Sequence, residues 1–208
     1  MLWAIRQIFV PVNYLRIQHG EGVMKSKAVF DYVLPAVFTA ITVAVCVWLV
    51  IPLAVFQHPA LTPRLLELMA LMVVFYMAAL AAVATFERKG IDNLLRGGDA
   101  TLWVRDHSQG GKRTPKKLTY RQFISYLFGY LSFLSLLLYI ALIFLVSGWP
   151  RLQGKIAAIQ KMPAVVGEVT NVALFVLVFF FVWQLVFASL LGIYFLTERI
   201  QSLNDPES

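Results

Sequence analysis

The chain has 208 residues, of which 60% are hydrophobic and 14% are charged, and its formal net charge is +7. A soluble domain of this size lacks the polar surface to cover so much apolar material, so the composition excludes a soluble protein and indicates an integral membrane protein. The single cysteine, Cys46, excludes an internal disulfide and a metal site built from several cysteines.

Residues 1–28, which we call the head, have the pattern of an amphipathic helix lying at the membrane interface. Apolar residues recur at helical spacing, and they are Leu2, Ile5, Phe9 and Val12; polar residues occupy the other side, and they are Arg6, Gln7 and Asn13. Such a segment is stable at the level of the lipid headgroups. An ordinary cytoplasmic cap on a helix bundle is the alternative. The start lacks the features of a secretory signal, so we expect the first span to be retained.

Four apolar stretches are each long enough to cross a bilayer: residues 29–56, 65–86, 123–146 and 172–195. A bilayer core of about 30 Å requires roughly 20 helical residues. Hydrocarbon offers no partner for backbone polar groups, so spans of this kind must be helical. The acids inside them, Asp31 and Glu67, lie within a turn of an end. The predicted fold is an all-α membrane protein, a single domain with a four-transmembrane-helix bundle and the interfacial head.

The connections are predicted to be a tight turn, a basic loop over residues 87–122, an outer loop over residues 148–168 and a tail over residues 196–208. Pro59 and Pro63 indicate the tight turn, which predicts that spans one and two are antiparallel neighbours. Pro150 and Pro163 bracket an amphipathic stretch of the outer loop, which predicts a short helix on the outer leaflet.

Lysine and arginine are distributed unequally between the two sides of the predicted bundle. The head, the basic loop and the tail together carry fourteen of them, and the opposite side carries four. Because cytoplasmic loops are enriched in positive charge, we expect both termini and the basic loop to be cytoplasmic, with the protein in a bacterial inner membrane.

Small and polar side chains follow defined faces of the spans. Ser125, Gly129 and Ser132 share one side of span three, and small residues at this spacing allow close helix approach. These faces predict packing within a bundle and a homo-oligomer; the alternative is the lining of a conducting pathway. Gln184, near the middle of span four, is expected either to bond within the bundle or to contact another subunit.

Charged groups are absent from the centre of every span, which disfavours ion-coupled transport. Motifs for metalloproteases, phosphate-binding loops and serine hydrolases are absent, and the histidines, His19, His58 and His107, are scattered. We therefore expect no enzymatic activity and no cofactor.

The basic loop is the most plausible binding surface. It carries nine basic and four acidic residues, and the ten residues 112–121 include five basic and no acidic ones. Three interpretations compete: topology with attraction to anionic membrane lipids, docking of a cytoplasmic protein, and direct nucleic-acid binding, which the short tract disfavours. The expected partner-binding residues are Trp103, Arg105, Lys112, Arg113, Lys116 and Lys117.

In its overall plan, a short chain with four spans and a basic cytoplasmic surface, the protein resembles the membrane subunit of the Kiwa anti-phage defence system. The resemblance implies an oligomeric membrane sensor that anchors a soluble DNA-binding effector. The rival expectation is an oligomeric pore, whose lining candidates are Ser125, Ser132, Tyr139, Thr39, Thr42 and Gln184. A scaffold for an envelope-building complex is a third possibility.

Overall fold

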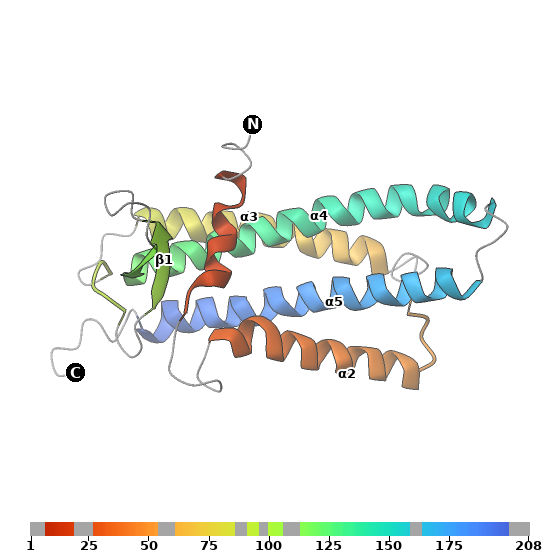
Figure 1. Cartoon of the computed structure of the whole chain (residues 1–208), viewed down its shortest axis with the longest axis horizontal. Helices are drawn as coiled ribbons and strands as arrows, with labels where there is room; N and C mark the ends of the chain where they lie inside the picture. The colour runs from red at the N-terminus through yellow and green to blue at the C-terminus, as the bar shows by residue number, and fades with distance from the viewer. Residues whose placement is uncertain are drawn as a thin grey trace.

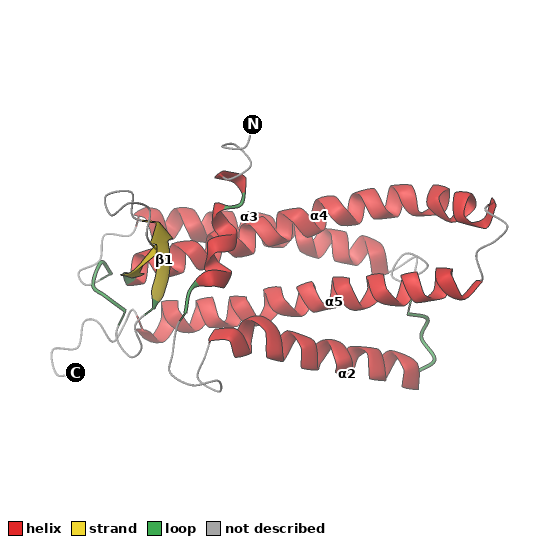
Figure 2. Ribbon diagram, viewed as in Figure 1, coloured by secondary structure: helices red, strands yellow, loops and turns green. Residues whose placement is uncertain are grey.

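The computed structural model describes residues 7–18, 27–53, 61–85, 91–95, 100–105, 113–158 and 164–199. Within these residues, four helices are long and apolar enough to cross a membrane: Val29–Trp48, Leu61–Thr85, Tyr120–Gly148 and Gly167–Thr197. Figure 2 shows that helices dominate the molecule and that a small sheet lies at one end. The predicted all-α bundle of four membrane helices is confirmed, and the chain is a multi-pass membrane protein.

The described elements in chain order are the 3-10 helix η1 (Val10–Arg16), the π-helical turn η2 (Val29–Val33), α2 (Leu34–Trp48), α3 (Leu61–Thr85), β1 (Thr101–Arg105), β2 (Arg113–Lys117), α4 (Tyr120–Ala158), α5 (Ala164–Tyr194) and the π-helical turn η5 (Phe195–Arg199).

The long helices form two pairs, α3 with α4 and α2 with α5, and contact between α4 and α5 joins the pairs (Figure 1). The prediction that spans one and two are neighbours is wrong, because α2 packs mainly on α5. A physical reason lies in hydrogen bonding, since Trp183 of α5 donates its indole N–H to Thr42 of α2 at 3.0 Å. Tyr76 of α3 bonds instead to Ser189, near the C-terminal end of α5, at 2.5 Å.

The ends of the spans differ from the predicted ones. Helix α2 ends at Trp48 rather than near residue 56, because the chain turns at Val50 and Pro52 follows. Helix α4 continues to Ala158, through the region predicted to be an outer loop with its own short helix. The helix continues past Pro150 although a proline removes a helical hydrogen bond and crowds the preceding turn, because the residues after it are mostly good helix formers. At about 1.5 Å per residue, α4 is about 58 Å long.

The interfacial amphipathic helix is not confirmed. Leu2 and Ile5 lie outside the described residues, and the described part of the head is mainly the short 3-10 helix η1, in which Pro11 occupies the first turn. Phe9 is exposed and packs edge-on against Phe133 of α4. The head crosses the helices at a steep angle in Figure 1 and is held by one fully buried residue, Tyr14.

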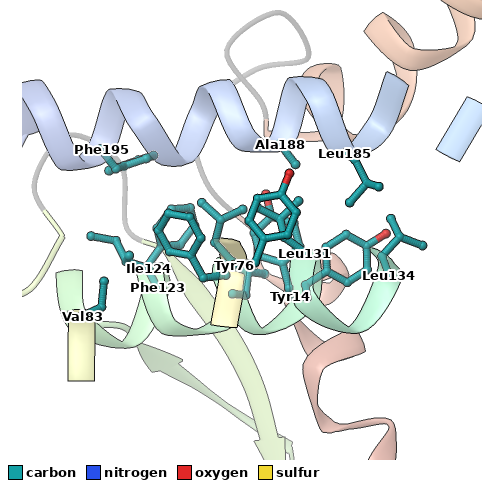
Figure 3. Packing of buried hydrophobic residues seen from close by; sticks show 14 of the residues in the cluster. Tyr14, Tyr76, Val83, Phe123, Ile124, Leu131, Leu134, Leu185, Ala188 and Phe195 are labelled. Carbon is teal, nitrogen blue, oxygen red and sulfur yellow. The ribbon is translucent and has the colours of Figure 1, made fainter. Parts of the chain in front are cut away.

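The buried core gathers where α3, α4, α5 and the head meet. Figure 3 shows Phe123, Ile124 and Leu131 of α4 facing Leu185 and Ala188 of α5 and Phe195 of η5, with Tyr14 inserted from the head. Many apolar side chains on the outer sides of the helices remain exposed, which is the expected pattern for surfaces that face lipid.

Candidate functional site

A buried ionic cluster lies at the start of the first span, where the sequence predicted only a charged boundary. Asp31 of η2 is 1% exposed and forms an ion pair with Lys27, one helical turn earlier. Tyr14 of the head donates its hydroxyl hydrogen to Asp31 Oδ1 at 3.1 Å. The Lys27 ammonium also lies 3.8 Å from the centre of the Tyr14 ring, a cation–π contact.

Burial shifts the pKa values of the two groups of this cluster that lie outside the membrane-spanning helix. Removal from water lowers the pKa of Lys27 below its usual value, and the neighbouring Asp31 carboxylate partly opposes this shift. Burial is also the main cause that raises the pKa of Tyr14, and the negative charge of Asp31 raises it further. Tyr14 therefore keeps its proton and acts as a hydrogen-bond donor. A buried ion pair tolerates desolvation only when other contacts replace water, and here Tyr14 supplies a hydrogen bond to Asp31 and a ring contact to Lys27.

Gln184 satisfies a backbone group next to this cluster. Pro35 has no N–H, so it cannot donate the helical hydrogen bond to the carbonyl of Asp31, four residues earlier. Gln184 of α5 is 2% exposed, and its Nε2 donates to that carbonyl at 3.0 Å. A neighbouring helix thus bonds the carbonyl that the proline leaves free. The Gln184 Oε1 atom has no hydrogen-bond partner among the described residues.

The other small and polar residues singled out in the sequence have different surroundings. Ser125 and Ser132 are partly buried on α4, and the Ser132 carbonyl accepts a hydrogen bond from Ser135. A Cβ atom added at Gly129 would meet nothing within 4 Å, so this glycine is not needed for contacts within the chain. The close helix approach occurs at Gly192 of α5, where a Cβ would lie 3.2 Å from both Leu127 and Phe128.

The predicted basic loop contains an antiparallel hairpin, which the sequence did not indicate. We call β1 and β2 together the basic hairpin. Leu118 donates its N–H to Ala100 at 2.9 Å, and hydrogen-bonded pairs alternate along an antiparallel ladder. Trp103 and Pro115 therefore oppose each other at a pair without ladder bonds, so the proline removes no hydrogen bond from the sheet.

The basic hairpin presents an aromatic and basic surface. Trp103 is 51% exposed, and Lys116 and Lys117 of β2 are also exposed, whereas Leu102 is buried beneath the strand. Arg105 and Arg113 pair in register at the far end of the two strands. Lys112 lies outside the described residues. Of the six residues expected to bind a partner, the register brings Trp103 and Lys117 to one face of the basic hairpin, whereas Lys116 lies opposite Leu102 on the other face.

Backbone hydrogen bonds and a helix cap attach the basic hairpin to the bundle. Gln18 of the head and Thr101 of β1 exchange two backbone hydrogen bonds, at 3.1 and 3.0 Å. At the start of α4, the Thr119 hydroxyl accepts from the Gln122 N–H and the Gln122 side chain accepts from the Thr119 N–H, a capping box. The described strands are therefore an ordered extension of the bundle.

No family model, curated protein or solved structure matches this chain. The class of protein therefore follows from its own geometry, a four-helix multi-pass membrane protein with a buried ionic cluster and a basic hairpin.

Proposed function

We propose that this protein is a membrane anchor of the bacterial inner membrane that docks a cytoplasmic protein through the basic hairpin. The observation that carries the proposal is the half-exposed indole of Trp103 on the same face of the basic hairpin as the exposed Lys117. A large aromatic side chain beside cationic groups is typical of the residues that contribute most to protein–protein binding. The matching surface would be acidic around an apolar pocket.

The order of the basic hairpin favours a docking role over a purely topological one. Positive charge retained for topology does not require a paired strand, a helix cap or backbone bonds to the head. A surface that is already ordered loses less conformational entropy when a partner binds, so more of the contact energy appears as affinity. An ion pair between Arg121 and Asp92, with 2.9 Å between Nε and Oδ1, adds a further contact at the end of the loop next to α4.

The position of the basic hairpin also suits a soluble partner. Tyr14 stacks on Tyr130 of α4 with ring centres 5.1 Å apart, at the level of the buried ionic cluster. Helix α4 begins at Tyr120, next to the basic hairpin. Tyr130 lies ten positions further along, so the hairpin and the buried ionic cluster are about 15 Å apart along the helix axis. If the first span begins at the ionic cluster, the hairpin stands clear of the bilayer core.

Co-purification with and without charge reversal tests the proposal. Replacing Lys116 and Lys117 with Glu should abolish capture of the partner, and replacing both with Arg should retain it. If charge dominates, binding of the partner to the unmodified chain should weaken as ionic strength rises, because exposed charges are screened over about 8 Å at physiological salt. Trp103→Ala should weaken binding at every salt concentration. If the Glu double variant and Trp103→Ala both capture the same proteins as the unmodified chain, the basic hairpin is not the docking surface.

An oligomeric pore is the competing function, and the hydrogen bonds within one chain weigh against it. Thr42 accepts from Trp183, Thr39 donates to the carbonyl of Pro35, and Gln184 bonds to Asp31. The two hydroxyls and the Gln184 amide N–H therefore already have partners within one chain, whereas a pore would need them to face water. Ion flux through liposomes that contain only the purified protein would favour the pore and count against anchoring as the primary role.

We further propose that the anchor is a homo-oligomer and that its partner is an effector of anti-phage defence, as the resemblance in overall plan implies. The open space beside Gly129 supports a contact between copies, because the surface there is not filled by the chain itself. Within one chain, the Cβ of a side chain at position 129 meets open space. If Gly129→Leu lowers the particle mass in mild detergent, the lost contact lies between chains; if the unmodified chain is monomeric, the oligomer is excluded.

A further inference from the structure

We infer that Tyr14, Lys27 and Asp31 form a latch that couples the position of the first span to the basic hairpin. We call these three residues the Tyr14 latch. The inference goes beyond docking, because it concerns how the membrane bundle and the hairpin act on each other. Its test uses the protein alone, so its outcome is independent of whether a partner binds.

The first step of the coupling joins the basic hairpin to the head. Thr101 of β1 and Gln18 exchange both of their backbone hydrogen bonds. Ile17, beside Gln18, is buried, and its N–H donates to the carbonyl of Tyr14 at 3.1 Å. Only three residues therefore lie between Gln18, which contacts the strand, and Tyr14, whose ring is buried, and the Ile17 hydrogen bond closes this segment on itself. A displacement of Tyr14 cannot be absorbed there without breaking one of these hydrogen bonds.

The second step joins the head to the first span. The hydrogen bond from Tyr14 to Asp31, the Lys27–Asp31 ion pair and the contact of the ammonium with the Tyr14 ring all meet within one buried cluster. Hydrogen bonds weaken steeply when their geometry changes, and a buried charge that loses its partner is strongly unfavourable. The latch therefore has a well-defined closed position, unlike an apolar contact that can slide.

The third step joins the first span to the fourth. The carbonyl of Asp31 accepts from Gln184 of α5, so the residue that holds Tyr14 is also fixed to the opposite helix. The same residue lies in the π-helical turn Val29–Val33, at the irregular start of the span. Single π-helical turns are frequent at functional sites. A shift of α2 relative to α5 would therefore act on Asp31, then on Tyr14, and finally on β1.

Amide hydrogen exchange at the hairpin tests the coupling in one direction. Tyr14→Phe removes the hydroxyl and keeps the ring. This variant should accelerate exchange of the Gln18 and Thr101 amides by about tenfold. Tyr76→Phe is the matched control, because it removes another buried tyrosine hydrogen bond, to Ser189, that is not part of the latch. Unchanged exchange in Tyr14→Phe, or an equal increase in Tyr76→Phe, would overturn the inference.

Reactivity of Lys27 tests the coupling in the opposite direction. Thr101→Pro removes the N–H that bonds to Gln18, and this should release the head and expose Lys27 to an amine-acylating reagent, with a severalfold faster reaction. Trp103→Pro is the control, because it places a proline on the same edge of the same strand, two residues away from the bond to the head. If Thr101→Pro leaves Lys27 protected, or if Trp103→Pro exposes it equally, the hairpin and the latch are not coupled.

Discussion

Val50 occupies a backbone conformation that its side chain disfavours. Its φ of 55° lies in the left-handed region, just after the end of α2. Ile51 donates to Cys46 at 2.8 Å and Val50 donates to Val47 at 3.1 Å, the two bonds of a Schellman motif. Glycine usually occupies this position, because a side chain in the left-handed region costs about 1–2 kcal/mol. The end of the first span is therefore strained at one residue.

Replacing Val50 with Gly should stabilise the protein, because it removes this strain. We expect the free energy of unfolding in mild detergent to rise by about 1 kcal/mol. Val47→Gly is the control, because it makes the same chemical change one turn earlier in helical backbone, and it should lower stability by about 0.5 kcal/mol. Thermal melting of both variants measures the difference, and a destabilised Val50→Gly protein would contradict the assigned turn.

Asp31→Asn should be strongly destabilising, because it leaves the Lys27 ammonium buried without a counter-ion. Breaking a buried ion pair in this way costs about 3 kcal/mol or more. The double variant Lys27→Met with Asp31→Asn should recover much of the loss, because it no longer buries a charge. Melting of the single and double variants checks the prediction, and equal stability of the two would mean that the pair is hydrated.

At the scale of the helices, two glycines that look alike in sequence are expected to respond in opposite ways. Gly129→Ala should raise the free energy of unfolding by up to about 1 kcal/mol, because alanine favours a helix and the added Cβ meets open space. Gly192→Ala should lower it by about 1 kcal/mol, because its Cβ would crowd Leu127 and Phe128 and push α5 away from α4. Chemical unfolding of the two variants measures both effects, and similar changes would show that α4 and α5 are not in close contact.

Hydropathy alone was enough to predict the four spans, because each exceeds the length that a bilayer requires. The basic hairpin could not be predicted in this way. The β2 sequence, Arg-Thr-Pro-Lys-Lys, has no alternating apolar pattern and contains a proline. Pro115 is tolerated because it falls at a pair without ladder hydrogen bonds. The register that places it there depends on the Leu118–Ala100 hydrogen bond and on the bonds between Thr101 and the head.

The buried ionic cluster was missed for a similar reason. An acid close to two lysines in sequence is usually a solvated boundary, and the residue that encloses it, Tyr14, lies 17 positions earlier in the head. The one local signal was Pro35, which leaves the carbonyl of Asp31 without its helical donor. Gln184, in another span, can donate the hydrogen bond that this carbonyl lacks, but nothing in the sequence indicates that the two groups meet.

For the whole molecule, the distribution of charge predicts the orientation in the membrane. In a Cys46→Ser background, a cysteine at position 114 should be protected from an impermeant reagent added outside intact cells, because the basic hairpin is expected to be cytoplasmic. A cysteine at position 155 should react from outside. Both sites should react after the membrane is permeabilised. Labelling of position 114 in intact cells would reverse the proposed topology and place the hairpin away from cytoplasmic partners.

The pairing of α2 with α5 has a consequence for biosynthesis. Helix α2 is made first and α5 last, so the ribosome completes three spans before the partner of the first one exists. Until then, the carbonyl of Asp31 lacks Gln184 and Thr42 lacks Trp183. The α3–α4 pair can form earlier, because these two helices are consecutive spans. The first span therefore remains in the membrane with unpaired polar groups until the last span is inserted. Insertion of α5 supplies these partners and completes the bundle.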